Sequence, residues 1–108
     1  MQELYKARDS AIKSLQNSMA RFAENGKLYA EKNRDYRVIL RQEILRLKAE
    51  GNPATLIEKL ARGTEEVAAA EFSKIVAENA YKASAENINV QKLILRSIEE
   101  QITREWRG

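Results

Sequence analysis

The sequence predicts an all-α protein, a long antiparallel helical hairpin of coiled-coil type with a short connecting helix. Ala, Glu, Leu, Ile, Lys and Arg are prominent, as they are in long helices. Four Gly and one Pro are too few for a protein with many strands and turns. The Pro and two of the Gly fall within residues 51–64, GNPATLIEKLARGT, where we expect the chain to reverse. With 108 residues, the whole chain, 1–108, is expected to form a single domain.

The first long helix is predicted over about residues 2–50. A spacing that alternates between three and four residues selects thirteen positions, nine of them apolar or aromatic, as expected for a helix packed lengthwise on another. The positions are Tyr5, Arg8, Ile12, Leu15, Met19, Phe22, Gly26, Tyr29, Asn33, Tyr36, Leu40, Glu43 and Leu47. Such a helix would be roughly 70 Å long. Gly26 is its weakest point, but we expect continuity because the spacing keeps its phase on both sides.

A short helix over about residues 53–62 is predicted to connect the two long ones. Gly51 is placed to end the first helix in a left-handed conformation. Asn52 suits the N-cap of the next helix and Pro53 its first position. The apolar residues of this helix either plug the end of the hairpin or form an exposed surface for a partner, and we favour the plug. They are Leu56, Ile57 and Leu60.

The second long helix is predicted over about residues 65–106, after a terminating Gly63 and a capping Thr64. Glu65 and Glu66 then lie in its first turn, where the helix dipole favours negative charge. Trp106 would be its last apolar anchor.

Small residues mark the first half of this second helix. They are Ala69, Ser73, Ala77, Ala80, Ser84 and Asn87, flanked by Phe72, Val76, Ala83 and Val90. These residues either allow close packing within the hairpin or a dimer, which we favour, or form a surface for a dedicated partner. If the two long helices are antiparallel, paired residue numbers should sum to about 114. Phe22 would then lie near Lys92 and Leu93, and Tyr36 near Glu78 and Asn79.

Two long helices alone bury only one stripe each, and this chain has apolar residues beyond those stripes. The extra residues include Val38, Ile39, Ile44 and Leu45 on the first helix, and Ile94, Leu95 and Ile98 on the second. The simplest way to bury them is self-association, so we predict at least a homodimer, arranged as a four-helix bundle.

The composition excludes several kinds of chemistry. The chain has no Cys and no His, which removes disulfides, thiolate nucleophiles and the commonest zinc ligands. No apolar run approaches the roughly 20 residues that span a bilayer, and the N-terminus lacks a signal-peptide segment. We expect a cytoplasmic protein without a membrane partner.

The first half of the chain is the basic half, with 11 Lys or Arg against seven Asp or Glu in residues 1–50. Five of its cations share one face of the predicted helix. They are Lys27, Arg34, Arg37, Arg41 and Lys48. This basic stripe could track a phosphate backbone. The favoured interpretation is a solvated face whose charges pair with acids such as Glu31, Asp35, Glu71 and Glu78.

No arrangement of residues predicts catalysis. Glu65 and Glu66 are sequence neighbours, as are Glu99 and Glu100, and neighbours on a helix point about 100° apart. Gly63-Thr64 lacks the spacing of a phosphate-binding loop. We therefore expect a protein that is not an enzyme and needs no cofactor or metal.

One long stretch resembles a known family. The run RDYRVILRQEILRLKAEGNPATLIEKLARGTEEVAAAEF, continuing through ENAYKASAENINVQKL to IEEQITREW, resembles small helical proteins encoded by phages and prophages of Gram-positive bacteria. The resemblance covers roughly Asn33 to Trp106. Genes of this family often lie among early replication and recombination genes, which implies a bacterial host cell. No activity is assigned to the family, so the resemblance implies no site residues.

Together these observations predict a non-enzymatic interaction protein that binds itself and a protein partner in replication or recombination. The alternative is a nucleic-acid-binding accessory protein that uses the basic stripe.

Overall fold

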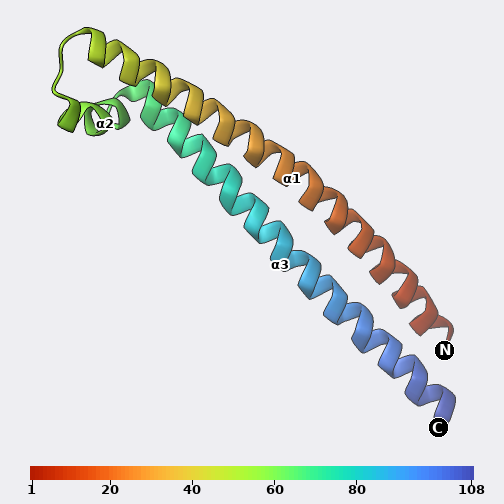
Figure 1. Ribbon diagram of the computed structural model, residues 1–108. Helices are drawn as coiled ribbons and strands as arrows, with labels where there is room; N and C mark the ends of the chain where they lie inside the picture. Colours follow the sequence, from red (N-terminus) through yellow and green to blue (C-terminus); the bar gives the residue numbers. More distant parts are fainter. The chain divides into compact units, whose positions relative to one another are not determined.

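The computed structural model describes residues 1–108 and contains three helices and no strand (Figure 1). Helix α1 spans Gln2–Ala49, α2 spans Ala54–Arg62 and α3 spans Glu65–Arg107. The all-α class is therefore confirmed, and each helix begins and ends within one residue of its predicted position. Helix α1 runs through Gly26 without a break, as the unbroken apolar spacing predicts.

The contacts between α1 and α3 divide into two compact units. The first unit contains residues 1–25 and 81–108, and the second contains residues 26–80. In each unit a segment of α1 lies antiparallel to a segment of α3 (Figure 1). The second unit also contains α2, and both chain termini lie in the first.

The turn after α1 is built by Gly51 and Asn52. Gly51 has φ +86°, a conformation that costs glycine little, and its N–H donates to the carbonyl of Lys48 at 3.1 Å. The N–H of Asn52 donates to the carbonyl of Leu47 at 3.3 Å, which completes a Schellman motif. The left-handed cap at Gly51 is therefore confirmed.

The predicted N-cap of α2 is wrong by one residue. Asn52 does not cap α2, because its side-chain Nδ2 donates back to the carbonyl of Leu47 at 2.9 Å. Pro53 occupies the N-cap position instead, in an extended conformation with ψ 135°. Thr64 likewise uses its hydroxyl on the preceding helix, donating to the carbonyl of Ala61 at 2.8 Å.

The tightest core lies in the second unit, where α2 meets α1 and α3. Its members come from all three helices and are almost inaccessible to solvent. They are Leu47, Ile57, Ala61 and Val67, of which Ala61 and Val67 are 0% exposed. Ile57 and Ala61 lie four residues apart and so share one face of α2. This face is buried in the same unit as Leu47 of α1.

The predicted register is wrong by about one heptad. Phe22 stacks on Tyr81 with ring centroids 4.8 Å apart, and does not lie near Leu93. Tyr36 contacts Glu71, not Glu78. With Tyr36 beside Glu71, α3 begins beside an earlier turn of α1 than a simple reversal would allow.

Polar side chains, and not only apolar ones, join the helices in the first unit. Asn25 Nδ2 donates to Ser84 Oγ at 2.5 Å, and Asn87 Nδ2 donates to Ser18 Oγ at 3.0 Å. Ser18 is 4% exposed and its hydroxyl also donates to the carbonyl of Ser14. No buried side-chain nitrogen or oxygen lacks a partner. Buried polar pairs of this kind favour one register, because a shifted register would leave them unsatisfied.

The stripe of α1 that was predicted to pack against the second long helix is also displaced in this unit. Ile12 and Met19 are 37% and 55% exposed, whereas Ala11 and Ser18, one position earlier, are buried. Small side chains at these positions let α3 approach closely, and Asn87 satisfies the hydroxyl of Ser18. Trp106 is not a buried anchor either: its ring is 73% exposed, although its Nε1 donates to Tyr5 Oη at 3.0 Å.

We predict that a cysteine pair replacing Asn25 and Ser84 will join efficiently within one chain through a short thiol-reactive crosslinker. The native chain contains no Cys, so the product is unambiguous, and its mass on a denaturing gel distinguishes it from a crosslink between copies. The pair F22C/L93C, which the simple reversal would bring together, should not react, because Leu93 lies about 18 Å along α3 from the residue that meets Phe22. The opposite pattern of reactivity would refute the observed register.

Candidate interaction surfaces

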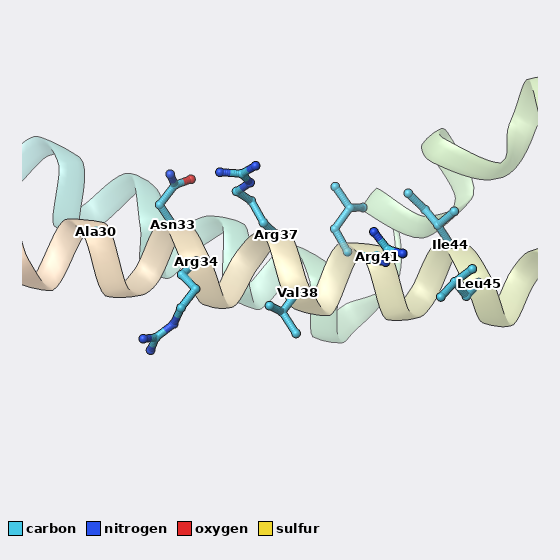
Figure 2. Close-up of a pocket in the computed structure, with 9 residues that line it drawn as sticks. Ala30, Asn33, Arg34, Arg37, Val38, Arg41, Ile44 and Leu45 are labelled. Atoms are coloured by element: carbon cyan, nitrogen blue, oxygen red, sulfur yellow. The ribbon is translucent and has the colours of Figure 1, made fainter.

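All five residues of the basic stripe are exposed on α1 in the second unit. They are Lys27, Arg34, Arg37, Arg41 and Lys48. At 100° per residue they lie roughly 100–180° around the helix from the buried ring of Tyr36. The stripe therefore faces away from α3, and Figure 2 shows the arginines extending from the α1 backbone.

Most of the stripe is electrostatically unpaired. Arg34 contacts its neighbour Asp35, with Nη2 and Oδ1 3.1 Å apart, and this pair is exposed. No carboxylate oxygen lies within 4.0 Å of the charged nitrogens of Lys27, Arg37, Arg41 or Lys48. The favoured sequence interpretation, a face neutralised by neighbouring acids, holds only for Arg34 and Asp35.

Cations outside the stripe bind three of the acids of this unit. Arg46 lies on a different face of α1 and binds both Glu43 and Glu50. Its guanidinium lowers the pKa of Glu43 below its ordinary value. Glu71, expected as a partner of the stripe, instead binds Arg62 of α2 at 3.2 Å. The chain thus holds these carboxylates away from the stripe.

Aliphatic side chains surround the middle of the stripe. Val38 and Leu45 are 49% and 53% exposed, while Leu40 and Ile44 are half-buried. With Ala30, Asn33 and the three arginines they line one shallow surface that belongs wholly to α1 (Figure 2). Sequence reasoning recognised Val38, Ile44 and Leu45 as excess apolar residues. It did not connect them with the arginines, although their helical spacing already placed both on one side.

The connector divides into an inner and an outer face. Ile57 is 7% exposed and belongs to the core, so this residue acts as the predicted plug and is not available to a partner. Leu56 and Leu60 point outward and are 50% and 44% exposed. Of the three residues proposed for partner contact here, only these two lie at the surface.

The outward face of α3 in the second unit carries no charge. Every exposed residue between positions 68 and 80 is apolar or neutral, and these residues are Ala68, Ala69, Phe72, Ser73, Ile75, Val76, Asn79 and Ala80. The charged residues within this segment, Glu71, Lys74 and Glu78, are all half-buried. Phe72 is the most exposed of the apolar residues in this segment, at 69%. The small residues of this helix were evident from the sequence. The absence of exposed charged residues from this face was not.

A polar cluster links the three helices beside this face. The hydroxyl of Tyr36 donates to Glu71 Oε2 at 2.6 Å, and Lys74 Nζ lies 4.5 Å from the centre of the Tyr36 ring. The hydrogen bond from Tyr36, with help from Arg62, lowers the pKa of Glu71. The same hydrogen bond raises the pKa of Tyr36. Tyr36 is 8% exposed and therefore belongs to the core.

No group of three or more Asp or Glu residues is arranged to hold a metal ion. No helix combines the length and apolar composition needed to cross a membrane. The chain matches no protein-family model, no curated protein and no solved structure. The resemblance to phage and prophage proteins therefore stays a prediction.

We predict that Tyr36→Phe lowers the free energy of unfolding by about 1 kcal/mol at neutral pH, because one buried hydrogen bond to a carboxylate is lost. The lowered pKa of Glu71 means that this contribution is present above its ordinary value of 4.5 and fades as pH falls below it. The raised pKa of Tyr36 means that it is also lost as pH rises above 10.0. Urea unfolding of both proteins across this range measures the difference.

The effect of Glu43 on acid unfolding is common to both proteins and cancels in that comparison. A difference between the two proteins that is as large at acid pH as at neutral pH would contradict the role given to Glu71.

Proposed function

We propose that this chain is a non-catalytic helical protein that acts by association. It pairs with a second copy of itself through the outward face of α3 and binds a further protein. The observation that carries self-association is the uncharged face between residues 68 and 80, with Phe72, Ile75 and Val76 exposed at its centre. An exposed helix face without charges is typical of a surface that another helix covers.

The apolar side chains of this face favour association. Phe72, Ile75 and Val76 are between 45% and 69% exposed, so burying the exposed part of each contributes roughly 1 kcal/mol. A symmetric dimer buries each of them twice. This contribution is small beside the cost of association, so we expect weak self-association that depends on protein concentration.

The geometry of such a dimer follows from the position of the face. Placing α3 of one copy against α3 of its partner brings four long helical segments together, two from each copy. Ala68 and Ala69 beside Phe72 allow the two backbones to approach closely. The resemblance to phage and prophage proteins supports the second part of the proposal, a protein partner in replication or recombination.

We predict that Val76→Glu makes the protein monomeric at concentrations where the native protein self-associates, because a buried charge without a partner opposes association. Sedimentation velocity over a micromolar concentration series measures the change. Val38→Glu is the matched control: Val38 is 49% exposed against 51% for Val76, but it lies on α1 outside the uncharged face. A native protein that sediments as a monomer throughout, or equal effects of the two substitutions, would overturn the self-association.

A second candidate function is nucleic-acid binding through the basic stripe. The observation that favours it is the lack of carboxylates near Lys27, Arg37, Arg41 and Lys48. Unpaired cations along one helix face can contact successive phosphates, with an affinity that falls steeply as salt rises.

If this second function holds, single- and double-stranded oligonucleotides bind at low salt, and the double reversal R34E/R41E abolishes the salt-sensitive binding. Fluorescence anisotropy at two salt concentrations measures both effects. No binding of either oligonucleotide at low salt removes this function.

A further inference from the structure

We propose that the partner docks an acidic amphipathic helix on the part of α1 that carries Arg34, Arg37 and Arg41. We call this surface, which also includes Val38, Leu40, Ile44 and Leu45, the arginine face. The proposal rests on the proposed function, since it specifies the chemistry of the protein partner.

The arginine face has the dimensions of a helix-binding surface. Arg34, Arg37 and Arg41 follow a spacing of three and four residues, so their backbone positions form one row along α1, from which the side chains of Arg34 and Arg37 extend to opposite edges (Figure 2). Ala30 and Ile44 continue this row at its two ends (Figure 2). From Ala30 to Leu45 the surface is about 22 Å long, which corresponds to about four helical turns. Helices that bind in grooves use anchors with this same spacing.

The central row selects carboxylates. All three of its cations are arginines, whose planar guanidinium groups bind carboxylates through two parallel hydrogen bonds. Only Arg34 has a carboxylate neighbour, and that pair is exposed. Arg37 and Arg41 have no acid within 4.0 Å. A partner with acidic residues at matching positions would complete all three.

The flanking aliphatic residues indicate which of two ligands, a protein helix or a nucleic acid, fits this surface better. Val38 and Leu45 lie half-exposed on one side of the row, and Leu40 lies on the other. Phosphate contacts make no use of such side chains, whereas an amphipathic helix buries them with its own apolar residues. The exposed aliphatic residues therefore favour a protein helix.

The α3 face of a second copy does not fit this surface. Its exposed residues between positions 68 and 80 include no carboxylate, so it would cover the arginines without neutralising their charge. Burying unpaired charges opposes association. The two surfaces thus serve different partners: the α3 face a second copy of this chain, and the arginine face an acidic helix.

The test uses the full chain and a synthetic helical peptide of about 15 residues. The peptide carries Glu at three positions with the spacing of Arg34, Arg37 and Arg41, and Leu at the flanking positions. A control peptide carries Lys in place of each Glu. We expect the acidic peptide to bind, and R37Q/R41Q and V38S/L45S each to weaken it by about tenfold. The matched control K27Q/K48Q removes two cations of the stripe outside the arginine face and should leave the affinity unchanged.

Several results would overturn the proposal. These are equal binding of the acidic and Lys peptides, unchanged affinity in R37Q/R41Q, or unchanged affinity in V38S/L45S. Oligonucleotides that bind more tightly than the acidic peptide, and are insensitive to V38S/L45S, would assign the surface to nucleic acid. All substitutions lie at exposed positions of one helix, and circular dichroism confirms that each variant stays helical. Self-association is measured separately, so it can persist when peptide binding fails.

Discussion

A helix that packs against one other helix can bury only one stripe of its surface, and this constraint governs the whole molecule. Helix α1 has 48 residues and α3 has 43, yet only eight apolar side chains in the chain are buried. Fifteen large apolar side chains are exposed. The short α2 relieves the constraint locally, because it adds Ile57 and Ala61 to the buried residues of the unit that contains Leu47. Elsewhere the surplus apolar side chains remain exposed.

Polar contacts compensate for this small core because they make one register of the helices more stable than the shifted registers. In the first unit, Asn25 with Ser84 and Asn87 with Ser18 pair across the seam. In the second unit, Glu71 accepts from Tyr36 of α1 and Arg62 of α2. Each contact contributes little net free energy, but shifting the helices would leave buried polar groups unsatisfied. The pairs also hold acids such as Glu71 away from the basic stripe.

The sequence predicted the helices well because their signals are local. The apolar spacing, Gly51 and the single Pro locate three helices and the reversal. The register could not be predicted in this way, because it depends on long-range contacts such as that of Tyr36 with Glu71, which the turn residues do not encode. The prediction that Ile12 and Met19 face α3 is wrong because it favoured large apolar side chains. The residues buried there are the small Ala11 and Ser18. The basic stripe was visible in the sequence, but the pairing of Glu43 and Glu50 with Arg46, and of Glu71 with Arg62, was not.

The central claim is that a second copy covers the uncharged face of α3. Thermal unfolding as a function of protein concentration tests it most directly, because a protein stabilised by self-association unfolds at a higher temperature when it is more concentrated. The account predicts that the unfolding midpoint rises steadily as the concentration increases through the micromolar range. A midpoint that stays constant over about a hundredfold range of concentration would show that Phe72 and its neighbours remain in water, and would contradict the claim.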